Sequence, residues 1–164
     1  SLSFLVMRVL FLFCLFCHSY GWVVGCASSQ RPRRRSTSIR ASDAVRSYNV
    51  GIIGGGTVGG GIVEILSEKS AFLRESLGVD AKISKICVRD AGRQRDFTLP
   101  DGCAVVTDVD DILADEAVQV VVEVMGGTEL AKTVVMRALQ AGKHVVTANK
   151  ALIAAYLPEL NALV

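Results

Sequence analysis

The sequence predicts an α/β fold in which helices cover both faces of a doubly wound parallel sheet. From Tyr48 onward, short continuous apolar runs alternate with segments whose apolar residues recur every three or four positions, which is the pattern of buried parallel strands joined by helices. A cluster of glycines separates the first apolar run from the first helical segment. The length of 164 residues and the hydrophobic content of 51% suit one globular domain.

The first part of this body predicts three strands and one long helix. Tyr48–Ile53 is the first strand, and glycines end it. A helix is expected over about Thr57–Leu73, because its apolar residues share one face. Lys82–Val88 is the second strand, and Cys103–Thr107 is a short third strand.

A short helix and the most apolar strand follow. Asp108 is a candidate N-cap for a helical turn that reaches Ala114. Val118–Met125 has the strongest strand character in the chain, because its valines are nearly continuous. We therefore expect this strand in the middle of the sheet.

The last predicted elements are a helix, a strand and the start of another helix. Thr128 can cap a helix that ends at Gly142, a residue that suits the position after a helix. His144–Thr147 is the fifth strand. Residues 151–164 begin a further helix, which Pro158 can interrupt, and the chain stops within it. We therefore expect the fold to be incomplete at its C-terminus.

Charge and cysteine content argue against several classes of protein. Residues 1–42 hold six arginines and no acidic residue, whereas residues 43–164 hold 12 basic and 16 acidic side chains. A body with this balance has no basic face for a nucleic acid, so we expect no such partner. Cys87 and Cys103 are expected to be small buried side chains in a reducing compartment.

Residues 1–45 are interpreted as a targeting leader and residues 46–164 as the folded body. Residues 7–27 have the basic start, short apolar run and small-residue end of a signal sequence. The apolar run is too short to span a bilayer, which takes about 20 residues. Residues 28–42 are rich in Arg and Ser and free of acids, as transit peptides are.

Together the two leader segments resemble the bipartite plastid-targeting leaders of algae whose plastids have extra membranes. The alternatives are a mitochondrial presequence, a plain secretory signal and a bacterial lipoprotein signal at Val23–Cys26. The arginine cluster can also be a solvated linker. After removal of the leader we expect no membrane association.

Gly54, Gly56 and Gly59 form a G-x-G-x-x-G pattern between a strand and a helix, as in Rossmann-type dinucleotide-binding domains. Gly54 allows the tight turn, Gly56 lets the main chain approach a pyrophosphate, and Gly59 lets the helix pack closely. The phosphates would lie at the helix N-terminus near Thr57, where free N–H groups attract anions. The alternatives are a glycine turn without a ligand and the glycine loop of a methyltransferase that binds S-adenosylmethionine.

The end of the second strand bears on the choice of cofactor. Arg89 and Asp90 follow this strand, with Arg93 and Arg95 close behind. An arginine would pair with the 2′-phosphate of NADP, whereas a carboxylate would accept from the 2′-OH of NAD. Because the arginine comes first, we favour NADP(H), with NAD(H) as the alternative. Arg89 can also be a solvated surface charge.

Residues after the fourth and fifth strands should face the nicotinamide and the substrate. Gly126 and Gly127 let the main chain pass close to the cofactor, and Thr128 offers a hydroxyl if it does not only cap its helix. Lys150 is the candidate catalytic residue, because an ammonium there can polarise a carbonyl or stabilise an alkoxide. Its alternative role is a solvent-facing lysine at a helix start.

Two other polar residues are interpreted as structural, and no residue is assigned to a metal. Glu123 is expected at a sheet edge or an inter-domain contact, because a fully buried carboxylate would need a partner. His144 opens the fifth strand at the edge away from the cofactor.

Three blocks of sequence together resemble the nucleotide-binding domain of homoserine dehydrogenase. They are VGIIGGGTVGGGIVEIL (50–66), VVVEVMGGTELA (120–131) and AGKHVVTANKALIA (141–154). The resemblance covers about Tyr48–Val164 and implies interconversion of L-homoserine and L-aspartate 4-semialdehyde with NAD(P)(H). It also implies a role in the synthesis of threonine, methionine and isoleucine.

Carried over by position, the resemblance assigns roles to nine residues. The pyrophosphate would be held by Gly54, Gly56, Thr57, Val58 and Gly59, the 2′-phosphate by Arg89, and the nicotinamide side by Thr128, Thr147 and Lys150. Gly127 is a further candidate cofactor residue because it follows the fourth strand. The family's substrate domain, with its other catalytic groups and dimer contacts, does not appear in the sequence. We therefore expect a fragment that is inactive alone, from a monofunctional homodimeric enzyme. The alternatives are a regulatory NADP-binding module without catalysis and another semialdehyde or imine reductase.

Overall fold

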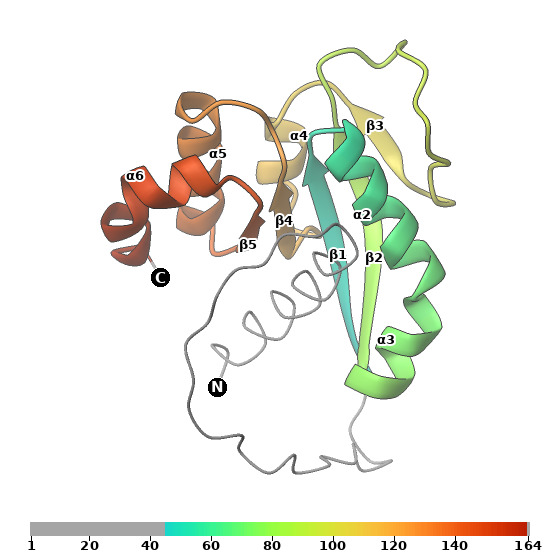
Figure 1. Ribbon diagram of the computed structural model, residues 1–164. Coiled ribbons are helices and arrows are strands. Elements are labelled where there is room, and N and C mark those ends of the chain that lie inside the picture. The colour runs from blue at the N-terminus through green and yellow to red at the C-terminus, as the bar shows by residue number, and fades with distance from the viewer. Residues whose placement is uncertain (1–44, 164) are drawn as a thin grey trace, which may run out of the picture. The chain divides into compact units, whose positions relative to one another are not determined.

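Five parallel strands form one sheet in the computed structural model, which describes residues 45–163 (Figure 1). In chain order the strands are β1 (Arg46–Ile53), β2 (Val79–Cys87), β3 (Ala104–Val106), β4 (Val120–Glu123) and β5 (His144–Thr147). Their order in the sheet is β3-β2-β1-β4-β5, and each neighbouring pair is parallel. The predicted parallel sheet is confirmed. The predicted signal-like and transit-like segments lie outside the described residues.

Helices cover both faces of this sheet, as predicted. They are α2 (Thr57–Glu68), α3 (Ser70–Leu77), α4 (Asp110–Leu113), α5 (Glu129–Gln140) and α6 (Lys150–Asn161). Ile52 and Ile53 are consecutive in β1 and therefore point to opposite faces. Ile52 belongs to the core that includes Val63 of α2, and Ile53 belongs to the core with Ile112 of α4 and Val134 of α5. A third cluster packs α6 against α5.

The direction in which successive strands are added to the sheet reverses at β1. From β1 the chain moves outward to β2 and β3, then returns to the other side of β1 to form β4 and β5. The carboxyl ends of β2, β1, β4 and β5 lie level, because Ile53 pairs with both Cys87 and Glu123, and Glu123 pairs with Thr147. Ligands of open α/β sheets bind at such a reversal, outside the carboxyl ends of the strands.

The long helix predicted over residues 57–73 is in fact two helices. The break is at Lys69, and the second helix, α3, extends to Leu77 before Gly78 adopts a left-handed conformation with φ 63°. Next to the break, the Ser67 hydroxyl donates to Val63 O at 2.8 Å and the Ser70 hydroxyl donates to Ser67 O at 3.1 Å. Serine hydroxyls that bond to preceding carbonyls bend helices, which accounts for the interruption.

Other predicted boundaries shift by a few residues. β4 is shorter than the predicted 118–125, because it pairs with both neighbours only over Val120–Glu123. The N-cap of α4 is Val109 and not the predicted Asp108, whose carboxylate accepts from Asp110 N at 2.9 Å just before the helix. Pro158 lies inside α6 and does not end it.

The position of Glu123 differs from the prediction. This residue lies in β4, which has β1 on one side and β5 on the other, so it is not at a sheet edge. Its side chain is fully buried, with 0% exposure. The expected position at a sheet edge or an inter-domain contact is therefore wrong, and the partners of Glu123 are two hydrogen-bond donors, Met125 N and the Thr147 hydroxyl.

The two cysteines of the body differ in burial. Cys87 is buried, as predicted, and burial raises the pKa of its thiol, with further contributions from Asp108 and Asp111. Cys103 is only partly buried, because it precedes the edge strand β3, and partial burial raises its pKa as well. Both thiols are free.

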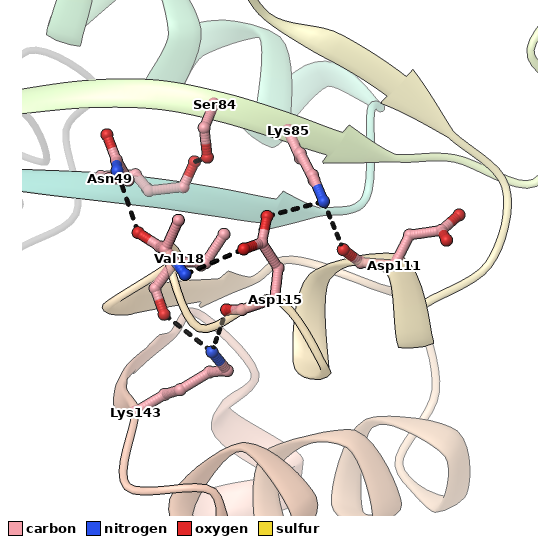
Figure 2. Close-up of polar contacts among 9 residues, drawn as sticks. Asn49, Ser84, Lys85, Asp111, Asp115, Val118 and Lys143 are labelled. Atoms are coloured by element: carbon pink, nitrogen blue, oxygen red, sulfur yellow. Dashed lines mark hydrogen bonds and ion pairs between the residues drawn. The ribbon is translucent and has the colours of Figure 1, made fainter.

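Polar side chains tie β2, the α4–β4 connection and the start of β5 together (Figure 2). Lys85 Nζ lies 2.7 Å from Asp115 Oδ2 and donates to Asp111 O at 2.7 Å. Lys143 is buried, and its ammonium donates to Asp115 O at 2.6 Å and Val118 O at 2.8 Å. These bonds satisfy two cations with carbonyl and carboxylate oxygens, away from the carboxyl edge of the sheet.

Candidate functional site

The glycine turn after β1 is packed tightly on one side and open on the other. Gly54 has φ +117°, and a Cβ there would lie 2.7 Å from Val124 O. A Cβ on Gly59 would overlap Gly54 O, so the helix can approach the strand only with glycine at this position. A Cβ on Gly56, in contrast, would meet nothing within 4 Å. The turn therefore leaves main chain accessible at Gly56.

The N-terminus of α2 lies in this turn. Gly56 is the N-cap, no side chain caps the helix, and the first turn contains no acidic residue. The first N–H groups of a helix have no partner within it, and the helix dipole adds positive potential. Thr57 and Val58, both exposed, open the helix. The turn and helix start together fit an anionic group such as a pyrophosphate.

A pocket of about 340 Å³ lies next to this turn at the carboxyl edge of the sheet. It is formed by the start of α2 and by the loops that follow β4 and β5; the lining residues are Val58, Val124, Met125, Gly126, Gly127, Ala148, Asn149 and Lys150. Lys150 is the only charged residue in this lining. Lys150 is exposed and makes no ion pair with any residue that the structure describes.

Hydrogen bonds beneath the pocket join its two loops. Glu123 Oε1 accepts from Met125 N at 2.7 Å, and Glu123 Oε2 accepts from the Thr147 hydroxyl at 2.5 Å. Thr147 Oγ1 in turn accepts from Asn149 N at 3.0 Å. Asn149 Nδ2 donates to Gly127 O at 2.6 Å, and Asn149 Oδ1 caps α6 by accepting from Leu152 N at 3.1 Å. The loop after β4 is thus fixed to the loop after β5.

The loop after β2 forms a separate polar region. Arg89 and Asp90 are exposed, and Asp90 Oδ1 accepts from Gly92 N at 2.9 Å. The Arg95 guanidinium donates to Asp90 O at 2.7 Å, to Arg93 O at 2.9 Å and to Ala91 O at 3.4 Å. Its Nε lies 3.4 Å from where a Cβ on Gly55 would stand, so Arg95 is next to the glycine turn.

The structure brings most of the predicted site residues to one edge. Val58, Gly127 and Lys150 line the pocket, and Gly56 and Thr57 lie in the adjoining turn. Thr128 occupies the N-cap of α5, but its hydroxyl makes no capping bond, so the predicted capping role of its side chain is wrong. Thr147 lies behind the pocket lining, bonded to Glu123. Arg89 lies apart, on the β2 loop.

The sequence indicated no role in the site for Asn149, and it indicated only a structural role for Glu123. Asn149 stands between a strand and a helix, and the N-cap preference of asparagine was a usable signal for it. The bond from Asn149 to Gly127 joins residues 22 apart and carried no local signal. Arg95 was noted only as a neighbour of Arg89, whereas the structure places it closer to the glycine turn.

A larger cavity, about 440 Å³, lies at the opposite edge of the sheet and includes Gln119, Lys143 and His144. His144 is at the amino end of β5, as predicted, and its ring contacts that of Tyr48 with 6.5 Å between centroids. The G-x-G-x-x-G turn and the start of α2 lie at the other edge, and the ammonium of Lys143 is already bonded to two carbonyls. We therefore assign the functional site to the smaller pocket at the carboxyl edge.

The part of the chain that the structure describes has neither a cluster of metal ligands nor a helix that could span a membrane. Within residues 45–163, no three His, Cys, Asp or Glu side chains gather in a way that could hold a metal ion. No helix in the same range is long and apolar enough to cross a membrane.

Comparison with known proteins gives a consistent result. Residues 54–164 match the family model of the homoserine dehydrogenase NAD-binding domain. Homoserine dehydrogenase of Bacillus subtilis is 41% identical over 118 residues, which are 72% of this chain and 27% of that protein. The chain therefore spans about a quarter of the length of such relatives.

Solved structures agree with this match. The S. aureus homoserine dehydrogenase structure at pH 7.0 has a TM-score of 0.66 and 37% identity, over 72% of this chain and 30% of that one. A hyperthermophilic archaeal homoserine dehydrogenase in complex with NADPH has a TM-score of 0.56 and 26% identity, over 72% of this chain and 40% of that one.

Proposed function

Since the chain belongs to the homoserine dehydrogenase family, we propose that it is the cofactor-binding part of an enzyme that interconverts L-homoserine and L-aspartate 4-semialdehyde. The cofactor, when bound, supplies or accepts the hydride. One observation carries the proposal. Three features lie together at the point where the order of strands in the sheet reverses. They are the glycine turn, the start of α2 without a side-chain cap, and a pocket in which Lys150 is the single charged residue.

The glycine turn would hold the pyrophosphate. Gly56, Thr57 and Val58 offer main-chain N–H groups at the start of α2, and the open space at Gly56 admits the phosphates. Gly54 and Gly59 contribute indirectly, since their close packing keeps the turn in this shape.

The loop after β2 would hold the adenosine ribose, and we favour NADP(H) over NAD(H) there. Arg89 is exposed, and Arg95 is oriented by three carbonyls with no partner for its Nε–H among the described residues. Two guanidinium groups suit a 2′-phosphate. One archaeal relative was solved with NADPH, whereas the GenD2 structure was solved with NAD, so the preference rests on the two arginines. Asp90, which has one carboxylate oxygen bonded to Gly92 N, is the group that would accept from the 2′-OH of NAD.

The pocket would hold the nicotinamide. Gly127 has φ +85° and no neighbour within 4 Å of a Cβ, so its main chain can lie close to the ring. Three polar groups are available to the nicotinamide half of the cofactor. They are the Thr128 hydroxyl, which makes no capping bond, the Thr147 oxygen and the Lys150 ammonium. Lys150 would place a positive charge near the substrate oxygen, where negative charge grows during hydride transfer.

The substrate groups, assembly and pathway are proposed from the family alone. We infer that the complete enzyme has a substrate domain, forms a homodimer and serves threonine, methionine and isoleucine synthesis. The composition of residues 1–45 supports import into a plastid, and the N-terminal sequence of the mature protein tests this. A mature chain that retains residues 28–42 would contradict plastid import.

The test of the proposed function is homoserine-dependent reduction of NADP+ and NAD+ by the full-length protein. We expect turnover with homoserine, faster at low concentration of NADP+ than of NAD+. Lys150→Met should lower kcat by about a hundredfold, because it removes a charge that stabilises the transition state. Lys69→Met, at an exposed lysine between α2 and α3, is the matched control and should be as active as wild type.

Two results would favour the alternatives. Cofactor binding without turnover of any semialdehyde would indicate a regulatory NADP-binding module. Turnover of another semialdehyde or an imine, with homoserine oxidised poorly, would indicate a different reductase of the same fold.

A further inference from the structure

Glu123 is the only fully buried acidic residue in the described part of the chain. No lysine, arginine or histidine within residues 45–163 forms an ion pair with it. A carboxylate is costly to bury without a cation, and apolar residues such as valine fill the rest of β4. The packing of the sheet therefore gives no reason for a glutamate at this position.

The hydrogen bonds of Glu123 close a ring around the pocket. The carboxylate accepts from Met125 N and from the Thr147 hydroxyl, Thr147 accepts from Asn149 N, and Asn149 donates to Gly127 O. Met125 and Gly127 belong to one pocket loop, and Asn149 belongs to the other. Both oxygens of Glu123 are used, one for each loop. The carboxylate thus fixes the separation of the two loops.

The bonds of Glu123 also have a direction. The Thr147 hydroxyl donates to Glu123 Oε2, so its proton points to Glu123. The Thr147 oxygen already accepts from Asn149 N and keeps one lone pair. Toward a ligand Thr147 can then act only as an acceptor, which suits an N–H donor such as a carboxamide. A glutamine at position 123 would turn an N–H toward Thr147 or Met125 and remove this order.

We propose that Glu123 is a positioning residue for the nicotinamide half of the cofactor site. This inference rests on the proposed function. Glu123 acts through Thr147, Asn149 and Met125, sets the width of the pocket and holds Lys150 at the start of α6. The adenosine half, at the β2 loop, is outside the ring and does not depend on it.

The test compares two ligands on the full-length protein. NADPH occupies both halves of the site, whereas 2′-phospho-ADP-ribose has no nicotinamide. Glu123→Gln keeps the size of the side chain and should weaken NADPH binding by about tenfold, the typical effect of disrupting a buried hydrogen bond. Binding of 2′-phospho-ADP-ribose should stay within about twofold of wild type. Glu75→Gln, at an exposed position of α3, is the matched control and should change neither.

A second variant cuts the same ring elsewhere. Asn149→Ser keeps a capping oxygen for α6 but cannot reach Gly127 O, so it should give the same selective loss. The NADPH affinity of the double variant should be at most about twofold lower than that of either single variant, because both substitutions break the same ring of hydrogen bonds. This second variant decides the matter if Glu123→Gln does not fold.

The outcomes separate this inference from the proposed function. If the folded variants lost affinity for both ligands equally, Glu123 would have a general structural role. If they lost affinity for neither ligand, Glu123 would have no role in binding. Either result would overturn this inference but not the proposed function. Additive losses in the double variant would overturn it as well. If wild-type protein bound neither ligand, the proposed function would fail, and the inference with it.

Discussion

Gly56 and Gly61 lie five residues apart, and a Cβ at either would meet nothing within 4 Å. They differ in position, because Gly56 caps α2 at the turn whereas Gly61 lies inside the helix. Gly56→Ala should leave stability unchanged, since φ −85° suits alanine, but weaken NADPH binding by about tenfold, as forced overpacking costs about 1–3 kcal/mol. Fluorescence titration with NADPH and a thermal melt measure the two effects.

Gly61→Ala is the control for the same experiment. It should bind NADPH as wild type does and raise stability by up to about 1 kcal/mol, because alanine favours helix more than glycine does. Normal NADPH affinity in Gly56→Ala would show that no phosphate approaches the turn there.

Arg95 offers a test of cofactor preference at a single side chain. Arg95→Ala should weaken NADPH binding by about tenfold, because it removes a charge-assisted bond to the 2′-phosphate, and should change NADH binding little. Arg74→Ala, at an exposed position of α3, is the control. Titration of each variant with NADPH and with NADH gives the ratio of the two affinities. A parallel loss of both affinities would mean that Arg95 only shapes its loop.

At the scale of elements, one ion pair connects β2 to the segment before β4. The Lys85 ammonium that bonds to Asp115 holds the pKa of that carboxyl below its usual range, with help from the N–H of Ala117. A carboxyl whose pKa is lower in the folded state stabilises the fold above its unfolded pKa, and this contribution is lost as pH falls through the folded pKa.

Asp115→Asn should therefore lower the melting temperature at neutral pH and flatten its fall in acid. Melting curves of the full-length protein between neutral pH and about pH 3 measure this dependence. Asp101→Asn is the control, at an exposed carboxylate without an ion pair among the described residues. An acid dependence in Asp115→Asn equal to that of wild type would contradict the assignment.

The strands and most helices could be predicted because their patterns are local. The valines of β4, the glycines after β1 and the apolar stripes of α2 and α5 each occupy a short window of sequence. The break at Lys69 was not predicted, since it depends on two serine hydroxyls that bond to carbonyls behind them, and apolar periodicity continues across it. Boundaries of β4 depend on where its neighbours stop pairing, which no local window contains.

At the scale of the whole molecule, the site depends on the order of strands in the sheet. Sequence predicted which residues follow each strand, and hence Val58, Gly127 and Lys150 at one edge. It predicted a central position for β4 but not its neighbours β1 and β5, between which Glu123 is buried and reaches Thr147 and Met125. Contacts between the two pocket loops exist only after the sheet has formed, so the ring through Asn149 needed the structure.

Within the described residues, one cavity lies at each of two opposite edges of the sheet, and the one at the carboxyl edge is beside the glycine turn. A crystal structure of the full-length protein with NADP+ tests the choice most directly. We expect the pyrophosphate at the N-terminus of α2 and the nicotinamide against Gly127 and Lys150. A dinucleotide bound at the other edge, beside Lys143 and His144, would contradict it.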